Sequence, residues 1–390
     1  MSTRSRRSFR KRRIIPASYK PRPGSAPGSL AASPLSHPSE VFVMAYGPDG
    51  YVEHTCKDVE EINQFLTAWP VVWVNVIGLG NIEVIEKIGN MFTLERLLLE
   101  DVLDTTSRPK VEYYENYVFT IMKGGLVSEQ FESEQFSIFL KKNVVIVFEE
   151  KINHSFHQVR ERIRRGTGKI RASGTDYLYY ALLDEVIDNY FPILDKMNHQ
   201  LVQIEDDIMS GNQQARDNKD AIQQIHLTKS DLLLMHRTIW PTSDVISMIM
   251  RQDTPLITKP TRNYLRDCYD HAMQANELTQ FYRDTATGLL NTFLAYEGHK
   301  TNEIVKVLTM VSAVFIPLNF IASIYGMNFH PDKSPLNMPE LEWYFGYPFA
   351  LSMMFMVAIG MVILFKRRGW LPGKIQNGNY TNSNGNGQST

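Results

Sequence analysis

The chain has 390 residues and carries 41 Lys and Arg against 42 Asp and Glu, which gives a formal net charge of −1 at pH 7. A charge so close to zero identifies no partner by itself, and we expect no nucleic-acid partner. The two cysteines, Cys56 and Cys268, are too few for a disulfide framework or a thiolate metal site, which suits a reducing cytosolic compartment.

Both ends of the chain predict disorder. Residues 1–39 contain no acidic residue and are rich in Arg, Ser and Pro, so we expect a disordered basic tail. It lacks the long apolar core of a secretion signal. Contact with anionic lipid heads and a transit-peptide role stay open, although a solvated tail is favoured. Residues 372–390 are rich in Asn, Gly and Ser and predict a second disordered tail.

Residues 40–153 mix short β-rich runs with helical ones and predict a cytoplasmic α/β domain with a mixed sheet. Strands are expected at residues 71–76, 117–122, 136–140 and 144–148. Helices are expected at residues 83–92 and 94–103.

After residue 153 the apolar residues recur at helical spacing, which predicts a cytoplasmic helical funnel or stalk over residues 154–303. Helices are expected at residues 176–209, at 219–251 and from about residue 262 onward. No Pro or paired Gly interrupts residues 263–316. One helix is therefore expected to continue into the apolar stretch that follows, with a length of roughly 90 Å.

Two apolar stretches, residues 307–325 and 348–365, lie in the last quarter of the chain. Each is close to the roughly 20 residues that a helix needs to cross a hydrocarbon core about 30 Å thick. The sequence therefore predicts a membrane protein with two spans. We place the first span at residues 304–326, an extracytoplasmic loop at 327–346 and the second span at 347–366.

The first span carries a polar stripe that the second span lacks. Ser312, Asn319 and Ser323, with Ile316 among them, are spaced at steps of four, three and four residues and therefore share one helical face. Unpaired amides and hydroxyls in hydrocarbon cost several kcal/mol, so this face must meet water or another polar surface. Either several copies assemble around a pore with the first span innermost, or the polar side chains join two helices.

The charges that flank the spans indicate an orientation. Lys300 and Lys306 precede the first apolar stretch, residues 307–325. Residues 366–368, Lys-Arg-Arg, follow the second, residues 348–365, so both chain ends are expected in the cytoplasm. The loop outside then carries three acidic residues, Glu340 among them, against one Lys. This charge would draw cations toward the mouth of a pore, although a merely solvated loop fits the same residues.

Several short motifs resemble those of one known family. They are Glu100-Asp101-Val102-Leu103, Arg108-Pro109-Lys110-Val111-Glu112, Glu115-Asn116-Tyr117-Val118, Lys300-Thr301-Asn302-Glu303, Tyr325-Gly326-Met327-Asn328 and Met338-Pro339-Glu340-Leu341. Together they resemble the CorA family of magnesium and cobalt transport proteins over about residues 41–371.

The resemblance implies a homopentamer in membrane lipid, with the first spans around a central pore. It assigns Gly326, Met327 and Asn328 to an outer selectivity ring. Mg²⁺ dehydrates reluctantly and favours oxygen ligands, so amide and carbonyl oxygens can hold its water shell. By similarity, the pore is lined by Asn302, Leu308, Ser312, Ile316, Asn319 and Ser323, with the two apolar residues as constrictions.

The resemblance also implies a regulatory Mg²⁺ site in the cytoplasm. Asp101 of one subunit would face Asp267 of its neighbour, with Glu100 and Asp184 nearby. Bound Mg²⁺ would hold the closed state, and its loss would allow opening. Similar proteins often carry an acidic residue where this chain has Asn291, which puts an intrapore site at that level in doubt.

The function implied is influx of Mg²⁺, also of Co²⁺ and with Ni²⁺ as a further candidate, driven by the membrane potential. That potential supplies about 4.6 kcal/mol per 100 mV for a divalent cation. No catalytic residues are expected, because no constellation of nucleophile, base and orienting group occurs. Residues 166–169, Gly-Thr-Gly-Lys, have the wrong spacing for a phosphate loop, so no nucleotide is expected.

Two alternatives stay open for the function and one for the location. The chain could transport Zn²⁺ or another divalent ion, or be a membrane-anchored Mg²⁺ sensor without flux. The expected location is the cell membrane, inner or plasma, with the mitochondrial inner membrane as the alternative.

Overall fold

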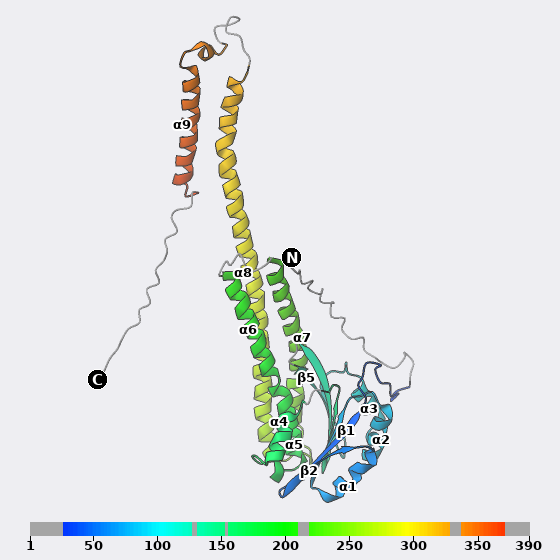
Figure 1. Cartoon of the computed structure of the whole chain (residues 1–390). Helices are drawn as coiled ribbons and strands as arrows, with labels where there is room; N and C mark the ends of the chain where they lie inside the picture. Colours follow the sequence, from blue (N-terminus) through cyan, green and yellow to red (C-terminus); the bar gives the residue numbers. More distant parts are fainter. Residues whose placement is uncertain (1–25, 127–130, 153–154, 210–217, 328–336, 371–390) are drawn as a thin grey trace, which may run out of the picture. The chain divides into compact units, whose positions relative to one another are not determined.

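The computed structural model describes residues 26–126, 131–152, 155–209, 218–327 and 337–370 (Figure 1). Its contacts divide the chain into two compact units, residues 1–290 and residues 291–390. We call them the N-terminal unit and the C-terminal unit and describe each by itself.

The N-terminal unit is built on a seven-stranded sheet. Its strands are β1 (Glu40–Gly47), β2 (Gly50–Cys56), β3 (Val71–Ile77), β4 (Lys110–Tyr113), β5 (Val118–Leu126), β6 (Glu132–Leu140) and β7 (Val144–Glu149). Their spatial order is β2-β1-β3-β7-β6-β5-β4, in which β3 and β7 are parallel and the other described pairs are antiparallel. The sheet is mixed, as the sequence predicts, and it also includes β1, β2 and β4, which lie outside the strands expected from the sequence.

Helices cover both faces of this sheet (Figure 1). One face carries η1 (Val59–Glu61), α1 (Ile62–Ala68), α2 (Ile82–Phe92) and α3 (Arg96–Leu103). The other face carries α4 (His157–Arg165), η2 (Ile170–Ala172), α5 (Thr175–Asp188), α6 (Tyr190–Met209) and α7 (Asn218–Arg251).

The central strand β3 is buried on both faces, because helices lie above and below it. Val72, Val74 and Val76 belong to the apolar core beneath α1 to α3. Trp73 points the other way, where its ring meets Phe156 edge-on at 5.9 Å between centroids. A strand that is buried on both faces has a nearly continuous apolar sequence, which is why this strand was correctly predicted from the sequence.

Residues 26–39 differ from the tail that the sequence predicts over residues 1–39. The backbone N–H of Gly28 donates to the Glu100 carboxylate at 2.7 Å, and the Arg96 guanidinium donates to the Gly28 carbonyl at 3.0 Å. Leu30 and Ala32 pack against the apolar core. The packing of Leu30 and Ala32 and these hydrogen bonds join the segment to the α/β domain, so the domain extends back at least to residue 28. Residues 1–25 lie outside the described part of the chain.

The single helix expected at residues 176–209 is divided into α5 and α6 at Asn189. Pro192 is the third residue of α6. Its missing N–H cannot bond to the Asp188 carbonyl, and a proline is tolerated only in the first turn of a helix. The apolar spacing continues across the break, which is why the pattern did not reveal it.

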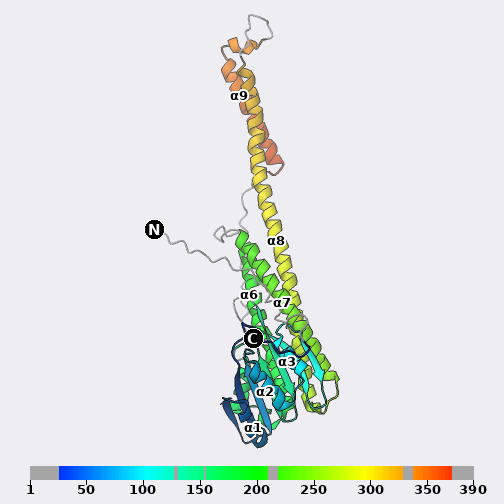
Figure 2. The same ribbon diagram turned by 90° about the vertical axis from the view of Figure 1, so that its right-hand side faces the viewer.

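The helix α8 (Lys259–Tyr325) is 67 residues long and contributes to both units. An uninterrupted helix of this length was expected from the sequence. The C-terminal unit holds the last part of α8, the short helix η4 (Pro339–Glu342) and α9 (Gly346–Arg367). In Figures 1 and 2, α9 runs beside the end of α8, and the Lys306 ammonium donates to the Gly369 carbonyl at 3.5 Å.

Candidate functional site

Two helices of the C-terminal unit are long and apolar enough to cross a membrane. They are α8, through its apolar C-terminal part, and α9, and the apolar parts of both contain almost no buried residue in the single chain. A large exposed apolar surface needs a lipid or protein partner.

One side of α8 is half-buried within the C-terminal unit, and α9 has a matching side. Within residues 301–325 of α8 the half-buried residues are Lys306, Met310, Ala313, Val314, Pro317, Leu318, Ile321 and Tyr325. Those of α9 are Ala350, Met353, Met354, Val357, Ala358 and Met361, and Phe365 is fully buried. Steps of three and four residues put each set on one helical face, which is the pattern of two helices packed along their length.

The six residues that the sequence places along a pore all lie off that packed side. They are Asn302, Leu308, Ser312, Ile316, Asn319 and Ser323, and each is exposed. Leu308 is 65% and Ile316 67% exposed. The polar hydroxyls and amides are therefore not used to join α8 to α9 within one chain. This geometry removes the simplest form of the alternative in which the stripe joins two helices.

The C-terminal end of α8 leads into the residues expected to form a selectivity ring. The backbone N–H groups of Gly326 and Met327 donate to Ala322 and Ile324 at 3.0 and 3.1 Å, so both residues close the last turn. The Met327 side chain is 48% exposed. Asn328, the expected ring amide, lies outside the described residues. On the other side of the loop, Glu340 lies within η4.

The four carboxylates of the expected regulatory site have different surroundings. Asp101 accepts a hydrogen bond from the Lys110 ammonium at 2.6 Å, and Glu100 accepts one from the Gly28 backbone. Asp267 is exposed on α8. Asp184 is half-buried in α5, and burial raises its pKa to about 6. The expected site joins two subunits, so its assembly stays a prediction.

Two clusters of potential metal ligands are found among the described residues. In the first, Asp184 lies with Asp188 and His271, and their ligand atoms are within 4.8 Å of one another. Asp188 and His271 were not predicted from the sequence as site residues. Spacings of four residues, from 184 to 188 and from 267 to 271, would have placed them on the same helical faces as Asp184 and Asp267.

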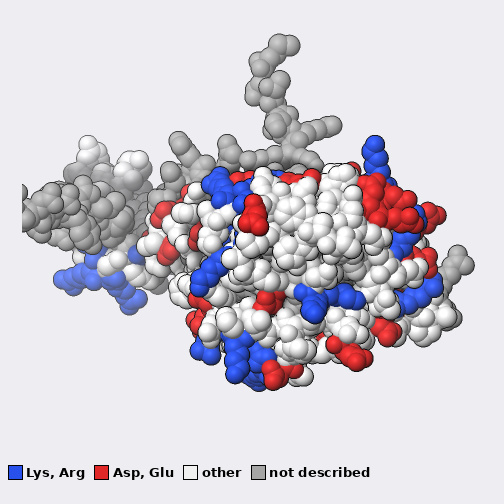
Figure 3. Space-filling model, turned by 90° about the horizontal axis from the view of Figure 1, so that it is seen from below, with Lys and Arg blue, Asp and Glu red and all other residues white. Residues whose placement is uncertain are grey.

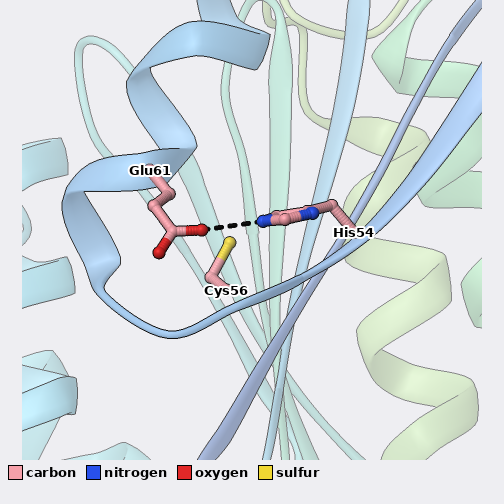
Figure 4. Close-up of side chains that lie close together, drawn as sticks. All are labelled: His54, Cys56 and Glu61. Carbon is pink, nitrogen blue, oxygen red and sulfur yellow. Dashed lines mark hydrogen bonds and ion pairs between the residues drawn. The ribbon is translucent and has the colours of Figure 1, made fainter.

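The second cluster consists of His54, Cys56 and Glu61, at the end of β2 and in η1 (Figure 4). This cluster was not predicted from the sequence, because two cysteines are too few for a metal site made of thiolates. The signal that could have found it is His-x-Cys in a strand, where alternate residues share a face.

Charged side chains of both signs are interspersed on the face seen from below in Figure 3. This agrees with a net charge of −1 for the whole chain.

The fold and the two apolar helices define a class: a membrane protein with a soluble α/β domain before two C-terminal spans. The model of the CorA-like Mg²⁺ transporter family matches residues 71–367. The chain belongs to this family. It is a family of transporters, which confirms the expectation that the chain is not an enzyme.

Individual relatives agree with this assignment. The cobalt/magnesium transport protein CorA of Thermotoga maritima is 39% identical over 352 residues, which cover 89% of this chain and 97% of the relative. The protein of the same name from Methanocaldococcus jannaschii is 25% identical over 333 residues, 85% of this chain and 100% of the relative. The solved CorA magnesium transporter of that organism has a TM-score of 0.71, at 23% identity over 85% of this chain and 98% of the other.

Proposed function

We propose that the chain forms a channel for divalent cations, which carries Mg²⁺ and also Co²⁺ into the cytoplasm. The uncovered polar face of α8 supports this proposal most directly. In a hydrocarbon environment that face needs water or polar partners, and its residues are not occupied by α9. A ring of identical α8 helices would supply polar partners and would enclose water. The family and the names of the relatives support the choice of ions.

In this proposal the protein is a homopentamer with both ends in the cytoplasm, in the cell membrane or, alternatively, in the mitochondrial inner membrane. Leu308 and Ile316 are apolar constrictions along the pore. Asn302, Ser312, Asn319 and Ser323 are polar rings, of which the Ser312 ring lies between the two constrictions and the other three lie beyond them. Apolar constrictions can close a pore by excluding water. The membrane potential drives influx without nucleotide, since a divalent cation gains about 4.6 kcal/mol per 100 mV.

Gating by cytoplasmic Mg²⁺ is part of the proposal. Carboxylates that meet across a subunit interface repel one another unless a cation lies between them. Asp101 and Asp267 are proposed as the facing pair, with Glu100 and Asp184 nearby. Asp101 already has Lys110 as a partner in the single chain, so Mg²⁺ would have to displace this ammonium.

The deciding experiment is Mg²⁺ uptake into liposomes that contain the purified protein, with an inside-negative potential. Asn328→Ala should abolish most of the uptake, because the outer ring of amide oxygens is lost. Asn263→Ala is the matched control, since Asn263 is exposed on the N-terminal part of α8. Unchanged uptake in Asn328→Ala would contradict the proposed selectivity ring.

The same liposomes separate transport from sensing. A wild-type protein that binds Mg²⁺ but carries no flux at any internal Mg²⁺ concentration would favour the sensor alternative. Competition among Mg²⁺, Co²⁺, Ni²⁺ and Zn²⁺ in this assay would rank the ions.

A further inference from the structure

His54, Cys56 and Glu61 bring three different metal-binding atoms together on the N-terminal unit (Figure 4). His54 and Cys56 are two residues apart on β2, so their side chains leave the same face of the strand. Glu61 comes from η1, five residues after Cys56 along the chain. The imidazole nitrogen, the thiol sulfur and a carboxylate oxygen all lie within 4.8 Å of one another.

The Glu61 carboxylate is held by one oxygen and offers the other. Its Oε1 accepts hydrogen bonds from the backbone N–H groups of Lys57 and Asp58, at 3.3 and 3.2 Å. Its Oε2 lies 2.7 Å from His54 Nε2. The backbone hydrogen bonds to Oε1 therefore fix the orientation of the carboxylate, and Oε2 remains directed at the His54 and Cys56 side chains.

The other two side chains are also held in place. The His54 ring packs against Phe65 of α1, with 5.6 Å between centroids. Cys56 is buried, at 9% exposure, and belongs to the apolar core. Side chains whose orientation is fixed by packing and by outer hydrogen bonds lose little freedom when they bind a metal.

We propose that His54 Nε2, Cys56 Sγ and Glu61 Oε2 form a binding site for a divalent transition ion of the Zn²⁺, Co²⁺ or Ni²⁺ type, and not for Mg²⁺. Imidazole and thiolate suit these ions, whereas Mg²⁺ requires oxygen ligands in near-octahedral geometry. The site is on the soluble unit and is independent of the transport proposal. It revises the expectation that two cysteines allow no thiolate metal site, since one thiolate in a mixed set is enough.

The separation of His54 Nε2 and Glu61 Oε2, 2.7 Å, fits such an ion after a small adjustment. Zn–N and Zn–O bonds of about 2.0–2.2 Å in a tetrahedron place the ligand atoms roughly 3.3–3.5 Å apart. The hydrogen bond between His54 and Glu61 would therefore lengthen by less than about 1 Å. Three protein ligands leave a fourth position for water. Access from the surface is available, because the side chains of His54 and Glu61 are 41% and 33% exposed.

Cobalt is the probe that tests the site, because a thiolate bound to Co²⁺ gives a charge-transfer absorption that oxygen ligands do not give. Co²⁺ is titrated into the purified full-length protein in detergent, with a phosphine reductant and excess Mg²⁺ present. A saturable thiolate band at one Co²⁺ per chain is expected, and Zn²⁺ should remove it while further Mg²⁺ should not.

Variants then assign the band to the cluster. Cys56→Ala should abolish it, whereas Cys268→Ala, at the other buried cysteine, should leave it unchanged. Glu61→Gln keeps an oxygen for the Lys57 and Asp58 N–H groups, so it should fold normally and weaken Co²⁺ binding. Circular dichroism checks that each variant is folded. No thiolate band in the wild type, a band that survives Cys56→Ala, or displacement by Mg²⁺ would overturn the proposal.

Discussion

Glu149 shows how much one carboxylate depends on its surroundings. It lies at the end of β7 with no exposed side-chain surface, where Asn75 donates to it at 2.6 Å and Arg160 is 3.6 Å away. Burial raises its pKa to about 7, and the nearby Glu134 and Glu185 add to the rise, while Arg160 and Asn75 oppose it. The neutral form is therefore favoured inside the sheet at mildly acidic pH.

This raised pKa makes the stability depend on pH. Between the ordinary Glu pKa of 4.5 and about 7, the folded protein holds a proton that the unfolded chain releases, so unfolding becomes easier as pH rises. Glu149→Gln removes this titration. The free energy of unfolding of the variant, relative to wild type, should therefore increase by up to about 3 kcal/mol from pH 4.5 to pH 8.

Thermal unfolding at several pH values, followed by circular dichroism, measures this difference for Glu149→Gln. The melting-temperature gap between variant and wild type should widen in favour of the variant as pH rises. Glu83→Gln, at an exposed position of α2, is the control and should show no such trend. A constant gap for Glu149→Gln would show that Glu149 does not titrate in this range.

At the scale of elements, Asp176 joins two helices that are far apart in the sequence. It lies in the first turn of α5, and its Oδ2 accepts hydrogen bonds from the backbone and hydroxyl of Thr258 and from the hydroxyl of Thr261. Burial would raise the pKa of this carboxyl, but these hydrogen bonds outweigh burial and lower it. The start of α8 is thus fixed against α5.

Thr261→Val should loosen this junction without changing the side-chain volume. A hydrogen bond to a charged group contributes about 1.5–3 kcal/mol, so the free energy of unfolding should fall by about that amount at pH 7. The pKa of Asp176 is lower in the folded protein than its ordinary value of 3.8. The loss of unfolding free energy in Thr261→Val should therefore reach its full size above pH 3.8 and become smaller as the pH falls below that value. Thr279→Val is the matched control, since Thr279 is buried on the same helix but bonds only to the Ala275 carbonyl. Equal losses in the two variants would argue against a special role for the carboxylate.

The elements differ in how far the sequence predicts them. The valine run of β3 and the uninterrupted α8 were located correctly, since both carry long, unambiguous patterns. The hairpin of β1 and β2 was missed because β2 is an edge strand of mostly polar residues, so apolar alternation is weak. The contacts of residues 26–39 were missed for another reason: backbone hydrogen bonds to Glu100 and Gly80 leave no trace in composition.

The candidate site also has one part that the sequence predicts and one part that it does not. The spacing of Ser312, Ile316, Asn319 and Ser323 predicted a shared face of α8, and the structure leaves that face exposed beside the side packed on α9. Spacing alone does not predict the full cluster of His54, Cys56 and Glu61, because Glu61 reaches the other two residues only through the turn between β2 and η1.

At the scale of the whole molecule, the proposed pore requires several copies of the chain. A single α8 helix cannot enclose water, so its exposed face must meet its symmetry equivalents or lipid. Lipid on that side would leave the amide and hydroxyls of Asn319, Ser312 and Ser323 without water or partner chains. A test of assembly should therefore use a residue on this face and a control at equal depth on α9.

Ile316 and Met356 provide that pair, because each is 67% exposed and lies near the middle of its span. Cysteines are introduced singly into a chain whose two native cysteines are replaced by Ala. Ile316→Cys would place a ring of thiolates around the pore axis, and several soft ligands together bind Cd²⁺ far better than one does. We expect micromolar-range Cd²⁺ to block Mg²⁺ flux of Ile316→Cys, and a chelator to reverse the block. Met356→Cys should be insensitive, since its thiolates would face lipid and lie apart. Insensitivity of Ile316→Cys, in protein that transports Mg²⁺, would place α8 outside the conduction path and leave the pore to other residues.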